Sequence, residues 1–192
     1  NNTADPHDFA DNDGNGYVDD YRGYDIGSDD AFVDPPTTSY SHGTRVAGVV
    51  AATSDNGIGI ASLGHGIRVL PVKATDNPFS ISHGYEAIAY AALMKSHVIC
   101  MAWGSPVSST TGQKVIDFAH STGAVLVAGA GNSNTHAFFY PAAYNHVIAV
   151  GSTNSNDIKS SFSNYGSWVD VSAPGENIYT TDVSNGYTTV SG

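Results

Sequence analysis

The middle of the chain alternates between short apolar runs and longer stretches in which apolar residues recur every three or four positions. The first pattern is typical of buried strands, and the second is typical of helices that bury one side. These patterns predict strands over residues 67–74, 97–103 and 124–130, and helices over residues 82–96 and 109–122. This regular exchange of strand and helix is the order that produces a parallel sheet.

The strands of the predicted sheet are apolar on both faces. Residues 98–101 read Val-Ile-Cys-Met and residues 125–128 read Val-Leu-Val-Ala. A strand needs this composition when helices cover both faces of its sheet. We therefore predict an α/β fold in three layers, with a doubly wound, mostly parallel sheet and helices on both faces. After a further strand at residues 146–150, shorter strands are predicted at residues 168–173, 177–181 and 187–190.

The first 41 residues follow neither pattern, because Asp, Asn, Gly and Pro dominate them and favour loops. Beyond this stretch, the small apolar residues 46–52 predict a buried helix for which Ser41 is the N-cap. A length of 192 residues is usual for one domain. We predict a single domain with an acidic loop region at residues 1–41 and an α/β core at residues 42–192.

Charge excludes one class of partner, and the length of the apolar runs excludes another. The chain has 7 basic and 18 acidic residues, and its basic residues are single and widely spaced, so they cannot neutralise a run of phosphates on a nucleic acid. The longest fully apolar run, residues 87–94, is too short to cross a membrane. We expect a protein without nucleic-acid or membrane partners, whose surface is rich in Ser, Thr and Asn because only 13% of its residues are charged.

The sequence Ser41-His42-Gly43-Thr44 places a histidine at the start of the predicted small-residue helix. A histidine there is held firmly and can still reach solvent. Its near-neutral pKa would let it take a proton from a nucleophile and return that proton to a leaving group. The alternative is a histidine in the capping region with no chemical role.

Residues 128–132 read Ala-Gly-Ala-Gly-Asn and leave the carboxyl end of a buried strand, the edge at which open α/β sheets bind ligands. The two glycines allow a substrate backbone to lie close, and the Asn132 carboxamide can donate a hydrogen bond to an oxyanion. A dinucleotide-binding loop would need a third glycine where Asn134 stands, and no phosphate-binding Gly-Lys-Ser/Thr motif is present.

Residues 11–20 match the first half of a calcium-binding loop. Oxygen ligands stand at positions 1, 3 and 5 of such a loop and glycine stands at position 6, which here are Asp11, Asp13, Asn15 and Gly16. Tyr17 would add its carbonyl oxygen. The spacing predicts a Ca²⁺ site.

The end of this loop departs from the regular pattern, because position 12 is Arg22 and not the usual bidentate Glu. Asp19 or Asp20 must then supply the closing carboxylate. The alternative is a solvated acidic turn. Calcium is the better interpretation, because four carboxylates within ten residues repel one another unless a cation offsets them.

Two other residue types give little chemistry. The remaining histidines show no His-Glu-x-x-His spacing and no Cys/His pairing of a zinc site. Cys100 cannot form an internal disulfide because it is the single cysteine, and its apolar neighbours indicate a buried strand thiol.

Taken in order, these segments resemble the subtilisin-like serine protease family, the subtilases or peptidase S8. Residues 41–48 resemble the family's histidine motif, and residues 128–133 resemble the segment that bears its oxyanion asparagine. Its later landmarks are matched by residues 140–142, 147–151, 161–166 and 171–175. The resemblance spans essentially the whole chain.

The resemblance implies a secreted, calcium-stabilised endopeptidase that cleaves polypeptides through an acyl-enzyme with a Ser/His/Asp triad. His42 would be the general base and acid, and Asn132 would donate its amide to the oxyanion. One wall of the substrate cleft would be Ala102, Trp103, Gly104 and Ser105. The other side of the specificity pocket would be Gly129, Ala130 and Gly131. The glycines would pair with the substrate as an added strand.

Two departures from the family pattern shape these expectations. The family's Asp-Ser/Thr-Gly and Gly-Thr-Ser-Met-Ala motifs are absent, so the catalytic Asp and Ser are not in this chain and Ser191 is not the nucleophile. Cys100 and Ala102 replace residues that are usually polar in the cleft. We expect the chain alone to be inactive and the remaining segments of the same protease to complete the fold. The alternative is a non-catalytic relative that serves as a calcium-dependent binding or structural module.

Overall fold

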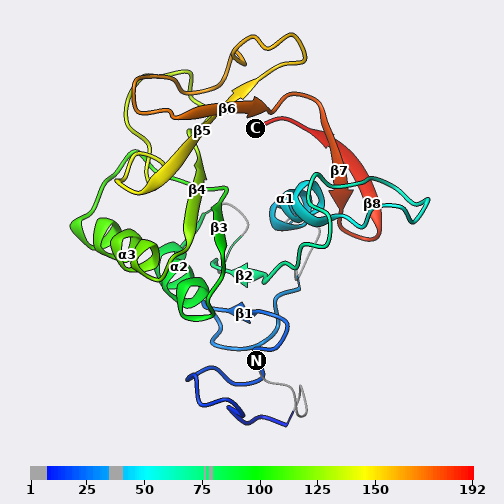
Figure 1. The fold of residues 1–192 in the computed structure, drawn as a ribbon, viewed down its shortest axis with the longest axis vertical. Helices are drawn as coiled ribbons and strands as arrows, with labels where there is room; N and C mark the ends of the chain where they lie inside the picture. Colours follow the sequence, from blue (N-terminus) through cyan, green and yellow to red (C-terminus); the bar gives the residue numbers. More distant parts are fainter. Residues whose placement is uncertain (1–7, 35–40, 76, 78–79) are drawn as a thin grey trace.

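The computed structural model describes residues 8–34, 41–75, 77 and 80–192 (Figure 1). Its largest sheet is parallel and has the strand order β3-β4-β5-β6. The four strands are β3 (Val98–Met101), β4 (Val125–Gly129), β5 (Val147–Thr153) and β6 (Val171–Pro174). The helices are α1 (His42–Ala51), α2 (Gly84–Leu93) and α3 (Thr110–Ser121).

Two smaller sheets complete the described chain. The strands β1 (Tyr24–Asp25) and β2 (Val72–Lys73) pair in parallel, and they tie the acidic N-terminal region to the rest of the molecule. The strands β7 (Ile178–Asp182) and β8 (Gly186–Val190) form an antiparallel hairpin that packs against α1. Figure 1 shows this hairpin and α1 together, away from α2 and α3.

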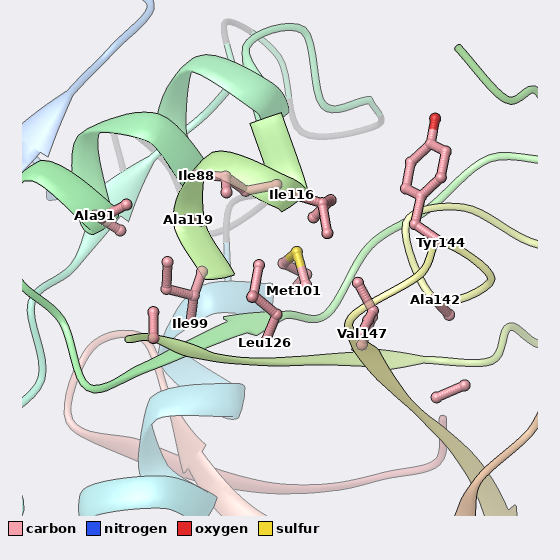
Figure 2. Packing of buried hydrophobic residues seen from close by; sticks show 14 residues of the cluster. Ile88, Ala91, Ile99, Met101, Ile116, Ala119, Leu126, Ala142, Tyr144 and Val147 are labelled. Atoms are coloured by element: carbon pink, nitrogen blue, oxygen red, sulfur yellow. The ribbon is translucent and has the colours of Figure 1, made fainter. Parts of the chain in front are cut away.

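The core lies between the parallel sheet and the helices α2 and α3. Helix α3 begins after Ser109, whose side-chain oxygen accepts a hydrogen bond of 2.8 Å from the Gly112 backbone N–H, as an N-cap should. Apolar residues spaced three and four apart then face the sheet from both helices. Figure 2 shows this packing, which includes Ile88, Ala91, Ile99, Met101, Ile116, Ala119, Leu126 and Val147.

The register of the sheet separates a buried face from an exposed one. Ile99 is level with Leu126 and Leu126 with Val147, and all three side chains are buried under the helices. The neighbouring positions point the opposite way, where Val98 is 57% exposed and Val125 is 47% exposed. Helix α1 lies on that side of the sheet in Figure 1 but packs against β7. The α/β class with a parallel sheet and helices is confirmed, and of the three helices in the described residues, α2 and α3 cover one face.

Most predicted elements match the structure within a few residues, with three corrections. The strand expected over residues 67–74 shortens to β2, Val72–Lys73. Ser41 does precede α1, but its side chain makes no capping hydrogen bond, and Gly48 is the buried residue of a helix expected to be buried throughout. Cys100 is exposed because its position in β3 faces away from α2 and α3.

Candidate active site

The predicted cleft residues meet at the carboxyl edge of the parallel sheet. Met101 is level with Ala128 at the ends of β3 and β4. Residues 102–105 and residues 129–132 therefore leave the same edge from adjacent strands, which is where the sequence placed the two walls. Trp103 also packs against the core cluster, and Ser105 forms a backbone bridge with Tyr140.

The ring of Phe139 lies between the two predicted walls. A Cβ atom on Gly104 would lie 2.3 Å from Phe139 Cε1, and one on Gly131 would lie 3.0 Å from Phe139 Cδ1. The backbone on either side is fixed, because Ser105 N–H donates to the Tyr140 carbonyl at 2.7 Å and Tyr140 N–H donates to the Ser105 carbonyl at 2.8 Å. The glycines at both walls therefore make room for one aromatic side chain.

The turn that carries Asn132 is shaped by the carboxamide of Asn164, which is 2% exposed. Its Oδ1 accepts hydrogen bonds from the N–H groups of Ser133 and Thr135, and its Nδ2 donates to the Ala130 carbonyl at 2.8 Å. Gly131 has φ +101°, and a Cβ there would lie 2.6 Å from Asn164 Nδ2. Only glycine fits, so the direction of the following Asn132 is set by this turn.

Asn132 opens onto a cavity of about 140 Å³ that residues from five parts of the chain line: 129–132, 150–152, Ser163, Ala173 and Gly192. Its Nδ2 atom lies 3.5 Å from the position that a Cβ atom would take on Gly192. The Asn132 amide, a hydrogen-bond donor, therefore lies beside the backbone at Gly192. His42 is not among the residues that line this cavity.

His42 is the first residue of α1, and its side chain is exposed. Partial desolvation lowers the pKa of the imidazole below its ordinary value, and the positive charge of Arg45, one turn further along the helix, lowers it further. Both causes disfavour the imidazolium form. His42 is therefore neutral at neutral pH and able to accept a proton, which is the state that a general base needs.

The acidic loop is held by hydrogen bonds from backbone and side chains. Both carboxylate oxygens of Asp11 accept from backbone N–H groups, those of Asn15 at 3.1 Å and Gly16 at 2.8 Å. Asn15 donates to Asp13 and to Asp20 through its Nδ2, and its Oδ1 accepts from the Tyr17 N–H at 2.7 Å. The six residues are thus linked by hydrogen bonds in which every side-chain acceptor is an oxygen.

The two candidates for the closing carboxylate differ in their partners. Asp20 is 4% exposed and its Oδ2 accepts from the Tyr90 hydroxyl at 2.9 Å. Asp19 is 5% exposed; its Oδ2 accepts from the Phe9 N–H, whereas its Oδ1 is buried with no hydrogen-bond partner among the described residues. A buried carboxylate oxygen without a donor has the chemistry of a cation ligand. Within the described ranges, no group of three or more His, Cys, Asp or Glu side chains is arranged to hold a metal ion.

Two residues of the edge were not singled out from the sequence. Phe139 carries no motif of its own, and its place between the walls depends on the fold. Asn164 lies within residues 161–166, which were recognised as a landmark without a role. The burial of its polar side chain indicates that Asn164 holds the turn by hydrogen bonds. The sequence alone does not show that a single polar residue is buried.

The fold and this edge define a parallel α/β domain with an amide donor where its strands end. Residues 6–192 match the model of the subtilase family, peptidase S8. The chain therefore belongs to the subtilase family of serine peptidases.

Several relatives support this assignment. The chain is 41% identical over 173 residues to the thermophilic serine proteinase of Bacillus sp. (strain AK1), which covers 89% of the chain. It is 42% identical over 161 residues to thermitase of Thermoactinomyces vulgaris, covering 82% of the chain. Among solved structures, the S41 psychrophilic protease superposes with a TM-score of 0.70 at 29% identity over 79% of the chain.

The chain spans about half the length of these relatives: 42% of the AK1 proteinase, 57% of thermitase and 58% of the psychrophilic protease. No helix in the described residues is long and apolar enough to cross a membrane.

Proposed function

We propose that the chain is part of a serine endopeptidase that hydrolyses peptide bonds through an acyl-enzyme. The observation that carries this proposal is the Asn132 amide beside Gly192, at an edge where two glycine-bearing walls meet. Membership of the subtilase family supports it. His42, neutral and exposed, is the proposed general base and acid.

In the proposed reaction, His42 takes the proton of a serine hydroxyl as that oxygen attacks the substrate carbonyl, and returns it to the leaving amine. Asn132 donates its amide to the negative oxygen that forms in between. Water then releases the acyl group by the same proton transfers in the second half of the reaction. Residues 1–192 contain neither the Gly-Thr-Ser-Met-Ala nor the Asp-Ser/Thr-Gly motif, so we expect this chain alone not to turn over.

The proposed substrate is an extended polypeptide. Residues 102–105 on one side and residues 129–131 on the other would hold it as an added strand, because backbone next to glycine can be approached closely. Phe139, between these walls, would be the apolar surface that a substrate side chain meets.

We further propose that residues 11–20 bind Ca²⁺ and that the protein works outside the cell. Asp11, Asp13, Asn15 and the Tyr17 carbonyl would be ligands, and the buried, unpartnered Oδ1 of Asp19 supports Asp19 as the closing one. The ion would supply positive charge that holds the acidic loop together. Millimolar extracellular calcium saturates weak sites of this kind, and the low content of charged residues supports an extracellular protein.

The test is intact mass of the purified protein before and after reaction with a fluorophosphonate that labels active serines. A species heavier than 19.9 kDa that gains one label supports the proposal. In that species His42→Ala should lower kcat/KM by about a thousandfold or more, the scale on which loss of a triad member acts in serine peptidases.

The matched control is His120→Ala, an exposed histidine whose ring stacks on His146 at 4.2 Å and lies on α3. It should leave kcat/KM unchanged. Failure of a full-length species to take the label would favour the alternative function, a non-catalytic, calcium-dependent binding module. The departures at Cys100 and Ala102 from the family's usual polar residues are the observation that favours this alternative.

A further inference from the structure

The helix that carries His42 is seated on the β7–β8 hairpin by two threonines. The hydroxyl of Thr181 donates to the Thr44 carbonyl at 2.8 Å, and the hydroxyl of Thr180, which is fully buried, donates to the Arg45 carbonyl at 2.7 Å. Gly48 provides the space, because a Cβ there would lie 2.2 Å from Thr181 Oγ1. The first turn of α1 therefore has a fixed position on β7.

An ion pair joins the same two elements. Arg45 donates from Nε to Asp182 Oδ1 at 3.2 Å and from Nη2 to Asp182 Oδ2 at 3.0 Å, so the pair is bidentate. The Val183 N–H also donates to Asp182 Oδ1 at 2.9 Å. Arg45 and this N–H lower the pKa of the Asp182 carboxyl, which is ionised at neutral pH. A bidentate geometry fixes orientation as well as distance.

The two elements that this pair joins contain few other ionisable groups. Apart from His42, Arg45 is the single charged residue of α1, and Asp182 is the single charged residue of the hairpin. The hairpin also has Tyr179 and Tyr187, whose rings stack on each other at 5.7 Å. The charge balance that His42 meets from these two elements is therefore set by one cation and one anion.

The hairpin also leads to the other half of the candidate site. Gly192 follows β8 by two residues, and its N–H donates to the Gly175 carbonyl at 2.9 Å. Gly192 lies beside the side-chain amide of Asn132. Arg45 and Asp182 therefore join the helix that begins at His42 to the hairpin that leads to Gly192, beside which the oxyanion would form.

We infer that Arg45 and Asp182 act as a positioning pair for His42, which we call the Arg45–Asp182 clamp. The clamp holds α1 in one orientation on the hairpin that leads to Gly192. The negative charge of Asp182 also counters the repulsion between the Arg45 guanidinium and a protonated His42 imidazole. The catalytic importance of this arrangement rests on the proposed function. The clamp itself and its electrostatic link to His42 do not.

The test is an NMR titration of the His42 imidazole in this chain and its variants. Arg45→Gln removes the cation and leaves the Asp182 carboxylate, so the pKa of His42 should rise. Asp182→Asn leaves the guanidinium without its anion, so the pKa of His42 should fall. Arg45→Lys keeps the charge and should keep the pKa near that of the parent, while the loss of the bidentate contact lowers Tm.

Opposite shifts are the decisive result, because a variant that merely loosened the helix would remove the partial desolvation of His42 in both cases and raise its pKa both times. Two shifts in the same direction, or no shift in either variant, would overturn the clamp. Lys114→Gln, which removes an exposed cation of α3, is the control and should leave the titration unchanged. If Arg45→Gln does not fold, Arg45→Lys and Asp182→Asn still make the comparison.

In a species that the fluorophosphonate labels, the same shifts should appear in the acid limb of the kcat/KM profile, which moves to higher pH in Arg45→Gln and to lower pH in Asp182→Asn. If the His42 imidazole titrates as expected but the protein takes no fluorophosphonate label, the clamp is supported and only the proposed peptidase function is contradicted. A labelled protein whose profile is the same in all three variants would retain the function and remove the clamp.

Discussion

The sheet face under α2 and α3 and the acidic segment at residues 8–34 are held together by different forces. Under the helices, Ile88 is 2% exposed, Ile116 is fully buried and Leu126 is 1% exposed. In the acidic segment the most buried side chains include Asp20 and Asp25. The first region is stabilised by the burial of hydrocarbon, and the second by charges that find partners.

The buried acids of this segment have partners inside the segment and also outside it. Asp25, 1% exposed, forms an ion pair with Lys73 of β2. Burial alone would raise the pKa of Asp25, but the bonds from Lys73 and from the Ser28 N–H outweigh it and lower this pKa. The contribution of Asp25 to stability is therefore present above the ordinary carboxyl pKa and is lost as pH falls through the lowered one. The hydrocarbon side chains of Ile88, Ile116 and Leu126 do not titrate, so their contribution has no such dependence on pH.

The largest expected effect is in the apolar region. Leu126→Ala should lower the free energy of unfolding by about 3 kcal/mol, because it removes a fully packed side chain and leaves a cavity. Urea denaturation measures this loss. Val125→Ala, the neighbouring position on the exposed face, is the matched control and should cost less than about 1 kcal/mol. Equal losses at the two positions would show that both faces are buried in solution.

The second prediction concerns the acidic segment and calcium. If residues 11–20 bind Ca²⁺, calcium at about 100 times its Kd should stabilise the protein by about 2.7 kcal/mol, and a chelator should lower Tm. Asp19→Asn should weaken this response, because it replaces the carboxylate that has a buried, unpartnered oxygen. Asp8→Asn, at an exposed position, is the control. A parent protein whose melting is unaffected by calcium and chelator would contradict the site.

A smaller effect is expected at the contact between the two regions. Tyr90→Phe removes the hydroxyl that donates to Asp20, and it should cost about 1 to 2 kcal/mol because the buried carboxylate loses a donor. Burial, and then the hydrogen bond to Asp20, raise the pKa of the Tyr90 phenol above its ordinary value.

The raised pKa of Tyr90 gives the sign of an alkaline effect. The folded state keeps a proton that the unfolded state loses above about pH 10, so this stabilisation is present below that pH and is lost as pH rises further. Denaturation at a series of alkaline pH values should show a shallower decline for Tyr90→Phe than for the parent. Parallel declines would mean that Tyr90 titrates normally.

The strands and helices of the apolar region could be predicted from the sequence, because the spacing of apolar residues within each short stretch determines its secondary structure. Residues 97–130 repeat apolar positions at strand and helix periods, and β3, α3 and β4 appear where those periods place them. The exposure of Val98 and Val125 could not be predicted in this way, since a strand that is apolar on both faces reads the same whether or not its second face is covered.

The candidate site was predictable only in part for the same reason. His42 and Asn132 belong to short motifs that gain meaning when they are taken together with the later segments, and the structure places Asn132 at the expected edge. Phe139, Asn164 and the pairing of Arg45 with Asp182 depend on segments far apart in sequence. Contacts at such separations leave no periodic pattern, and Asp182 on its own reads as one exposed acid near a turn.

The separate hairpin of β7 and β8 has a consequence for local unfolding. Its strands are hydrogen-bonded to each other in a sheet of their own, so it can open without breaking the ladder of β3 to β6. Opening would separate His42 from Gly192 while the rest of the core stayed native. The free energy of that opening, which amide hydrogen exchange measures at Thr180 and Thr188, therefore sets an upper limit on the fraction of molecules in which the two halves of the site are aligned.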